Sequence, residues 1–150
     1  MHLCENGLMA TVEVQHFLDR ARDFLKGKDL LRDKKLLGDD LDLYRLSFAL
    51  LGIHCAISYS DALRTGMGCE KVSLEDHSQA ANDLRKRLKS RSFENLKGIS
   101  HLESLIKMKN KIEYEPITIK ENQIEEIMKH AKRFAEWADT TGRNQQIEGW

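Results

Sequence analysis

The sequence contains few residues that interrupt helices and few signs of a secreted protein. Its 150 residues include one proline, and most of its nine glycines fall between segments of periodic apolar residues. Cys4, Cys55 and Cys69 are odd in number and far apart, which favours reduced thiols in a cytoplasm over a disulfide framework. No basic segment followed by an apolar run stands at the start, so we expect no secretory signal.

An excess of charge of either sign is also missing. The 24 Lys and Arg residues balance 24 Asp and Glu residues, so no overall charge draws the protein to nucleic acid or membrane. The longest apolar stretch, FALLGIHCAISY, is interrupted by His54 and is too short to span a bilayer. Aromatic residues make up only 7% of the chain and charged residues 32%, which is typical of a soluble all-helical protein.

Apolar residues recur at helical spacing along most of the chain. They predict five helices, over about 11–26, 40–65, 73–90, 93–114 and from 118 onwards. The second is apolar over most of its circumference, which is typical of a helix surrounded by others. The sequence therefore predicts an all-α, up-and-down bundle of about five helices.

Residues at the ends of these segments indicate where helices begin and end. Gly27 is a plausible end for the first helix, and Pro116 stops the fourth because the residue before a proline avoids helical geometry. Ser73-x-x-Asp76 and Thr118-x-x-Glu121 resemble capping boxes at helix starts. We expect residues 1–140 to form a single helical domain and the polar residues 141–150 to form a frayed tail.

A polar stripe runs along the second predicted helix. Ser47, His54, Ser58, Asp61 and Thr65 fall within about 60° of one another at 100° per residue. They could line a cleft, including one between two subunits. The alternative is that the stripe is the exposed side of the helix, with His54 as a half-buried polar residue.

A basic run and a possible metal-ligand pair complete the candidates found from the residues alone. Arg85, Lys86, Arg87, Lys89 and Arg91 could neutralise nucleic-acid phosphates, in which case affinity would fall steeply with salt. They could equally form a solvated helix face balanced by the acidic start of the fifth helix. His2-x-Cys4 has no second pair at suitable spacing, so we expect no metal site and no cofactor.

A family resemblance rests on the segment KMKNKIEYEPITIKENQIEEIMKHAKRFAEWA and on the long central helix before it. Together, residues 40–139 resemble the HEPN family, small helical bundles named for nucleotide binding in higher eukaryotes and prokaryotes. Many members carry Arg-Asn-x-x-x-His near the end of a helix. Here Lys109 stands at the Arg position, Asn110 at the Asn position and Tyr114 where the His would be. His77 matches a histidine at the start of the following helix.

The resemblance implies a homodimer whose signature residues face a cleft, in a prokaryotic toxin-antitoxin or defence system. The domain would bind RNA, a nucleotide or a partner protein, such as a nucleotidyltransferase-like antitoxin. Active relatives are metal-independent ribonucleases, so an enzyme using Lys109, Asn110 and Tyr114, with His54, is the alternative. Tyr114 departs from the pattern, because a phenol with a pKa near 10 is a poor base at neutral pH. A plain interaction bundle, with Lys109, Asn110 and Tyr114 as ordinary helix-end residues, is the third possibility.

Overall fold

The computed structural model describes the backbone of residues 2–32, 41–68, 77–116 and 118–150, and the side chains of 11–27, 29, 45–68, 77–116 and 118–150. The described residues form five helices and no strand. The helices are α1 (His2–Arg32), α3 (Leu41–Gly66), α4 (Ala80–Ser90), α5 (Ile99–Tyr114) and α6 (Glu121–Asn144). The predicted all-α fold of about five helices is confirmed.

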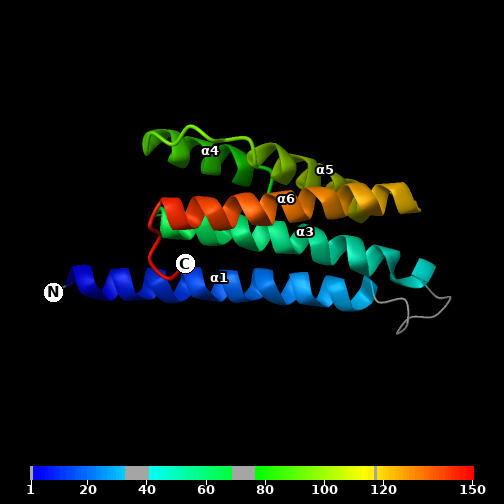
Figure 1. Ribbon diagram of the computed structural model, residues 1–150, viewed down its shortest axis with the longest axis horizontal. Helices are drawn as coiled ribbons and strands as arrows, with labels where there is room; N and C mark the ends of the chain where they lie inside the picture. The colour runs from blue at the N-terminus through cyan, green and yellow to red at the C-terminus, as the bar shows by residue number, and fades with distance from the viewer. Residues whose placement is uncertain (1, 33–40, 69–76, 117) are drawn as a thin grey trace.

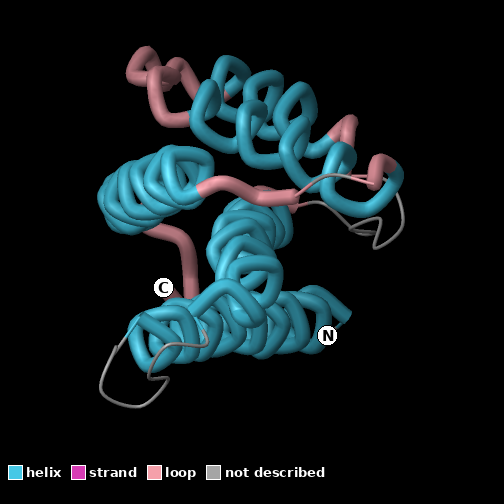
Figure 2. Tube along the Cα trace, turned by 90° about the vertical axis from the view of Figure 1, so that its right-hand side faces the viewer, coloured by secondary structure: helices cyan, strands magenta, loops and turns pink. Residues whose placement is uncertain are grey.

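Helix α3 is the centre of the bundle and packs against each of the other four helices. The long helix α1 lies along one side of α3 and runs antiparallel to it (Figure 1). Helices α4 and α5 lie on the opposite side, and α6 lies beside α3 between these two layers (Figure 2). Among the described helices, α3 is the main packing partner of α1.

The position of α3 follows from its side chains, which are apolar in several directions. From Phe48 to Met67 nearly every residue is buried, and Ala49, Ile53, Ala56, Ala62 and Leu63 are completely inaccessible. A Cβ atom at Gly52 would lie at ordinary contact distance from Ile127 and Ala131, so α6 packs against this turn of α3. The core that results includes buried residues from all five helices.

Helix α1 is longer than the predicted 11–26 segment. Gly27 does not end it, because the glycine lies within the helix and faces the side chain of Leu51 on α3. Burial of Val14, Leu18 and Ala21 against the core matches the apolar face expected from their spacing.

The beginnings of the later helices differ from the prediction. The capping box expected at Ser73–Asp76 lies outside the described residues, and the described part of α4 begins at Ala80. Residues 93–98 are not helical, and α5 begins at Ile99 after Gly98. Helix α6 begins after Lys120, whose backbone N–H donates to Oε1 of Gln123 at 2.8 Å, so the predicted box is displaced along the chain.

Residues 141–150 differ from the expected frayed tail. Helix α6 continues to Asn144, and the chain then folds back so that Ile147 is buried against Gly66. The indole Nε1 of Trp150 donates to Oδ1 of Asp139 at 3.2 Å, and its ring lies 6.3 Å from that of Tyr59. The apolar Ile147 and Trp150 explain why this otherwise polar segment is ordered.

Candidate functional site

The polar stripe of α3 passes from the surface into the interior. Ser47 is exposed and His54 is half-buried, whereas Ser58, Asp61 and Thr65 are only 3–4% exposed. The prediction of an exposed helix side is therefore wrong for the second half of the stripe. Burial of polar groups is costly unless they find partners, so the surroundings of these residues decide what they can do.

Two histidines and a lysine influence one another electrostatically near the middle of this stripe. Burial lowers the pKa of His54 on α3 and that of His77, which precedes α4, and the positive charge of Lys109 on α5 lowers both further. His54 acts in the same way on His77, while Glu113 has the opposite effect on both rings. We call His54, His77, Lys109 and Glu113 the histidine–lysine cluster. It is assembled from three segments that are far apart in the sequence.

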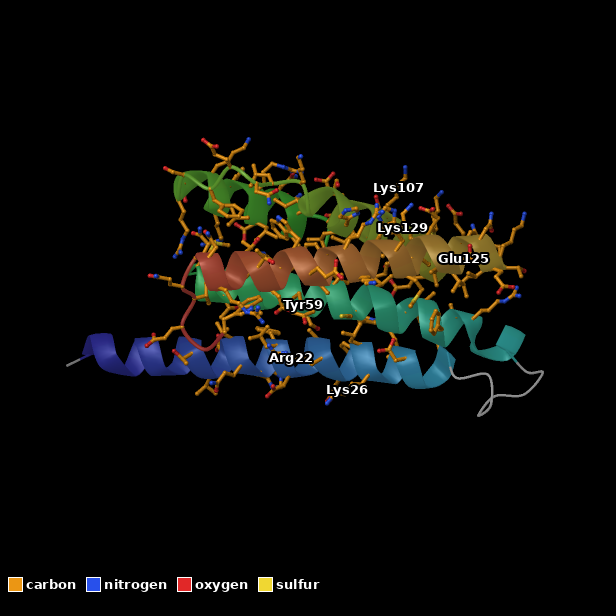
Figure 3. The ribbon with its side chains drawn as sticks, in the orientation of Figure 1. Arg22, Lys26, Tyr59, Lys107, Glu125 and Lys129 are labelled. Carbon is orange, nitrogen blue, oxygen red and sulfur yellow. The ribbon has the colours of Figure 1, made fainter. Side chains whose placement is uncertain are left out.

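The side chain of Lys109 is fixed by an ion pair on its own helix and is largely buried. Its Nζ donates to Oε2 of Glu113, one turn later on α5, at 2.8 Å. The Lys109 side chain is only 13% exposed, whereas Lys107 and Lys111 on the same helix are exposed. Lys107 lies on the outer side of α5 (Figure 3). Lys109 is thus the inward-facing lysine of this turn.

The two imidazoles are positioned in different ways. The ring of His54 lies 5.5 Å from that of Phe24 on α1, which covers one side of it. Nδ1 of His77 is buried and has no hydrogen-bond partner. Buried polar nitrogens are nearly always hydrogen-bonded, so this unsatisfied atom adds to the cost of burying the ring.

Burial is the main reason that the pKa values of His54 and His77 lie below 6.5, and the neighbouring cations lower them further. Both rings are therefore neutral near pH 7, each with one nitrogen that donates and one that accepts. Lys109 supplies a positive charge beside them. This combination can hold an anionic group by charge and hydrogen bonds, and a neutral imidazole can accept a proton.

A second polar group lies further along α3, where α4 packs against it. Nε of Arg64 donates to Oδ2 of Asp83 at 2.8 Å, and Nε of Arg87 donates to the same oxygen at 3.0 Å. Nη1 of Arg64 also lies 3.6 Å from Oδ1 of Asp61. We call Asp61, Arg64, Asp83 and Arg87 the aspartate–arginine network. It connects the stripe of α3 to α4.

The two aspartates of the network have opposite pKa shifts. Burial raises the pKa of Asp61 to about 7, although the charges of Arg64 and Arg20 oppose the rise. Burial also acts to raise the pKa of Asp83, but hydrogen bonds from Arg64 and Arg87 outweigh it and lower that pKa. The distance of 3.6 Å between Arg64 and Asp61 is too long for a hydrogen bond, and Oδ1 of Asp61 has none. The carboxylate charge of Asp61 is therefore only partly compensated by its neighbours, whereas that of Asp83 is compensated by two hydrogen bonds from arginines.

The structure separates the three residues of the proposed family signature. Lys109 faces inward, whereas Asn110 is exposed and Tyr114 is 81% exposed at the end of α5. Successive residues of a helix point about 100° apart, so Asn110 and Tyr114 lie on a different face from Lys109. Within one chain, Lys109 forms an ion pair with Glu113 and acts electrostatically on His54 and His77.

The five basic residues around α4 fall into two groups. Arg85 bonds to Asn82 and Glu103, and Arg87 bonds to Asp83 and to the carbonyl oxygen of Met67. The remaining three are exposed and have no ion pair within the part of the chain that the structure describes: Lys86, Lys89 and Arg91. The exposed three are the ones available to a phosphate backbone.

Sequence reasoning missed several members of these groups. Glu113 could have been found from its spacing to Lys109. Arg64 and Asp83 carry no local signal, because they meet only when α4 packs on α3. No group of three His, Cys, Asp or Glu residues suited to a metal was found among the described residues.

Comparisons with models of known protein families, with curated proteins and with solved structures found no match to this chain. One helical stretch, Arg45–Gly66, is long and apolar enough to cross a membrane by length and composition, although the prediction from its central segment was that it is too short. Of its most apolar window, 72% is buried within the fold, as is usual for the core helix of a bundle.

Proposed function

We propose that the protein binds RNA or a nucleotide, with a phosphate group held at the histidine–lysine cluster. The observation that carries this proposal is the largely buried side chain of Lys109, paired with Glu113, whose charge acts on both His54 and His77. A phosphate oxygen accepts hydrogen bonds, which the ammonium group and the imidazole N–H groups supply. Nδ1 of His77 has no partner among the described residues but is buried, so the ring must move before this atom can contact a phosphate oxygen.

The resemblance to HEPN domains supports the same class of ligand, since Lys109 stands at the position of the signature Arg. On this basis we propose a HEPN-like homodimer acting in the cytoplasm of a prokaryote, in a toxin-antitoxin or defence system. A nucleotidyltransferase-like antitoxin is the protein partner that this setting implies. The exposed Lys86, Lys89 and Arg91 would extend the contact along an RNA backbone.

Binding of fluorescent single-stranded RNA tests the proposal. We expect Lys109→Ala to weaken binding about tenfold or more, which corresponds to about 1.4 kcal/mol. Lys107→Ala is the matched control, because Lys107 has the same charge on the same helix but faces outward. Equal losses in the two variants, or no RNA binding by the unmodified protein, would contradict the proposal.

A metal-independent endoribonuclease is the second candidate. It is favoured by the presence of two neutral imidazoles beside one cation, since one ring can take the proton of a ribose 2′-hydroxyl. The 2′-oxygen would then attack the adjacent phosphorus, and the departing 5′-oxygen would take a proton from a protonated group such as Lys109. The products would be a 2′,3′-cyclic phosphate and a 5′-hydroxyl end.

Incubation of the protein with RNA in excess EDTA separates the two candidates. Cleavage that is lost in both His54→Gln and His77→Gln supports the enzyme. Cleavage that is lost in Tyr114→Phe but retained in both histidine variants would assign catalysis to the sequence signature instead. Binding without cleavage would leave the binding function alone.

A further inference from the structure

A pair of histidines joins α5 to α6 away from the histidine–lysine cluster. Nδ1 of His101 lies 2.8 Å from Nδ1 of His130, and the two ring centres are 5.1 Å apart. Both rings are partly exposed, so small ions in solution can reach them. Neither residue was singled out by sequence spacing, because they lie on different helices and meet only in the fold.

The contact requires a single proton shared between two nitrogens. One Nδ1 must carry the hydrogen and the other must accept it, so the two rings adopt opposite tautomers. With both Nδ1 atoms deprotonated, two lone pairs face a common position. Neutral imidazole nitrogen with a free lone pair is a preferred ligand of late first-row transition metals.

We propose that His101 and His130 bind a divalent transition-metal ion, with Ni²⁺ or Cu²⁺ preferred over Zn²⁺. At metal–nitrogen bonds of about 2.0–2.1 Å, two nitrogens at a right angle are about 2.9 Å apart and two at a tetrahedral angle are about 3.3 Å apart. The observed 2.8 Å matches the right angle of tetragonal and octahedral ions. Binding of the ion requires the two rings to turn so that both lone pairs point at it.

Glu126 gives the pair the outer partner that metal-binding histidines usually have. Its Oε2 lies 3.5 Å from Nε2 of His130, the ring nitrogen opposite the shared contact. A carboxylate at this position favours the tautomer with a proton on Nε2, which leaves Nδ1 for the metal. The other oxygen of Glu126 accepts from Nζ of Lys129 at 3.0 Å, so the nearest lysine charge is partly balanced.

The surroundings also limit the affinity. Arg133 and Lys129 both act electrostatically on His101 and would oppose a bound cation. Since the described residues hold no third protein ligand, water must complete the coordination shell. We therefore expect one site of modest affinity that fastens α5 to α6.

Calorimetric titration of the full chain with Ni²⁺ and with Zn²⁺ tests the site. We expect one equivalent of Ni²⁺ to bind more tightly than Zn²⁺, and this equivalent to be lost in His101→Gln. Glu126→Gln should weaken Ni²⁺ binding about tenfold or more while leaving the stoichiometry unchanged. In thermal unfolding, Ni²⁺ should stabilise the unmodified protein more than Glu126→Gln, and Glu126→Gln more than His101→Gln.

His16→Gln is the matched control, because His16 is exposed on α1 and far along the chain from the pair. It should bind Ni²⁺ as the unmodified protein does, and any binding by His2 and Cys4 is then common to all variants. Equal binding in His101→Gln and His16→Gln would overturn the proposal, as would the absence of a Ni²⁺ site or a preference for Zn²⁺. Circular dichroism of His101→Gln shows whether that variant is folded, and His130→Gln provides a second test if it is not.

Discussion

Arg64 and Asp83 form the ion pair that joins α3 to α4, with Nε 2.8 Å from Oδ2. The Arg64 side chain is 7% exposed, so its guanidinium group depends on protein partners for compensation. Its other acidic neighbour, Asp61, is too far away to accept a hydrogen bond. Asp83 is therefore the main partner of a buried cation.

Replacement of Asp83 by Asn should destabilise the protein. The change leaves the Arg64 charge without its carboxylate, and removal of one partner from a buried pair costs about 3 kcal/mol. The partial exposure of Asp83 places the expected loss at the lower end, roughly 2–3 kcal/mol by urea unfolding. Asp19→Asn on the exposed face of α1 is the control and should change stability by less than about 0.5 kcal/mol. A loss no larger than that of the control would mean that the ion pair contributes little.

Asp61 should make the protein less stable as the pH rises. Its pKa is about 7 in the folded chain and 3.8 when unfolded, so the folded state binds more protons between these values. Stability gained from Asp61 is complete below pH 3.8 and is lost as the pH rises towards and through 7. Asp61→Asn removes this titration, and we expect the variant to exceed the unmodified protein in stability at pH 8 by a few kcal/mol, roughly 2–4.

Thermal unfolding at pH 5 and pH 8 measures this effect. The unfolding temperatures of the two proteins should differ less at pH 5, where only part of the Asp61 contribution is lost, than at pH 8, where all of it is lost. If Asp61→Asn is instead destabilised by the same amount at both values, the carboxylate is ionised and paired with Arg64. That outcome would contradict the raised pKa of Asp61.

The histidines should act in the opposite sense. The pKa values of His54 and His77 are lowered in the folded protein, mainly by burial, so the unfolded chain takes up protons first as the pH falls below 6.5. Above pH 6.5 the two histidines do not change the stability with pH. As the pH falls below 6.5, the free energy of unfolding decreases until the pH lies below the pKa values of the folded state. The double variant His54→Gln and His77→Gln should lose less stability than the unmodified protein between pH 7 and pH 5. An identical slope in both proteins would show that these histidines do not titrate abnormally.

The fold could be predicted from apolar spacing, whereas much of the candidate site could not. Val14, Leu18 and Ala21 have a spacing that fixes which face of α1 is buried. The end of α1 was missed because Gly27 stays helical when Leu51 packs against it, which is a tertiary effect. Helix propensity alone predicts that a glycine weakens a helix and takes no account of such packing.

The polar stripe shows the same limit. Helical periodicity places Ser58, Asp61 and Thr65 on one face, but it cannot say whether that face is buried. Burial here depends on the helices that pack around α3, which lie far from it in the sequence. The grouping of Lys109 with His54 and His77 likewise requires three segments to pack together, and no local pattern encodes it.

Gly98 is expected to be intolerant of substitution. A Cβ atom built on it would overlap the indole of Trp137, whose Nε1 donates to the carbonyl oxygen of Asn95 at 2.9 Å. The indole is thus fixed over the glycine just before α5 and has little freedom to move. Gly98→Ala should cost about 2 kcal/mol in free energy of unfolding, because overpacking forces the ring or backbone to shift.

A double-mutant cycle with Trp137→Phe checks the cause. Phenylalanine is smaller and lacks the N–H group, so Gly98→Ala should cost clearly less in that background. The matched control is Gly52→Ala, since a Cβ at Gly52 meets Ile127 and Ala131 only at ordinary contact distance. We expect Gly52→Ala to be near neutral or slightly stabilising, because alanine favours a helix more than glycine does. If Gly98→Ala costs the same with Trp or Phe at position 137, the indole is not the obstacle. The requirement for glycine would then come from the backbone conformation before α5.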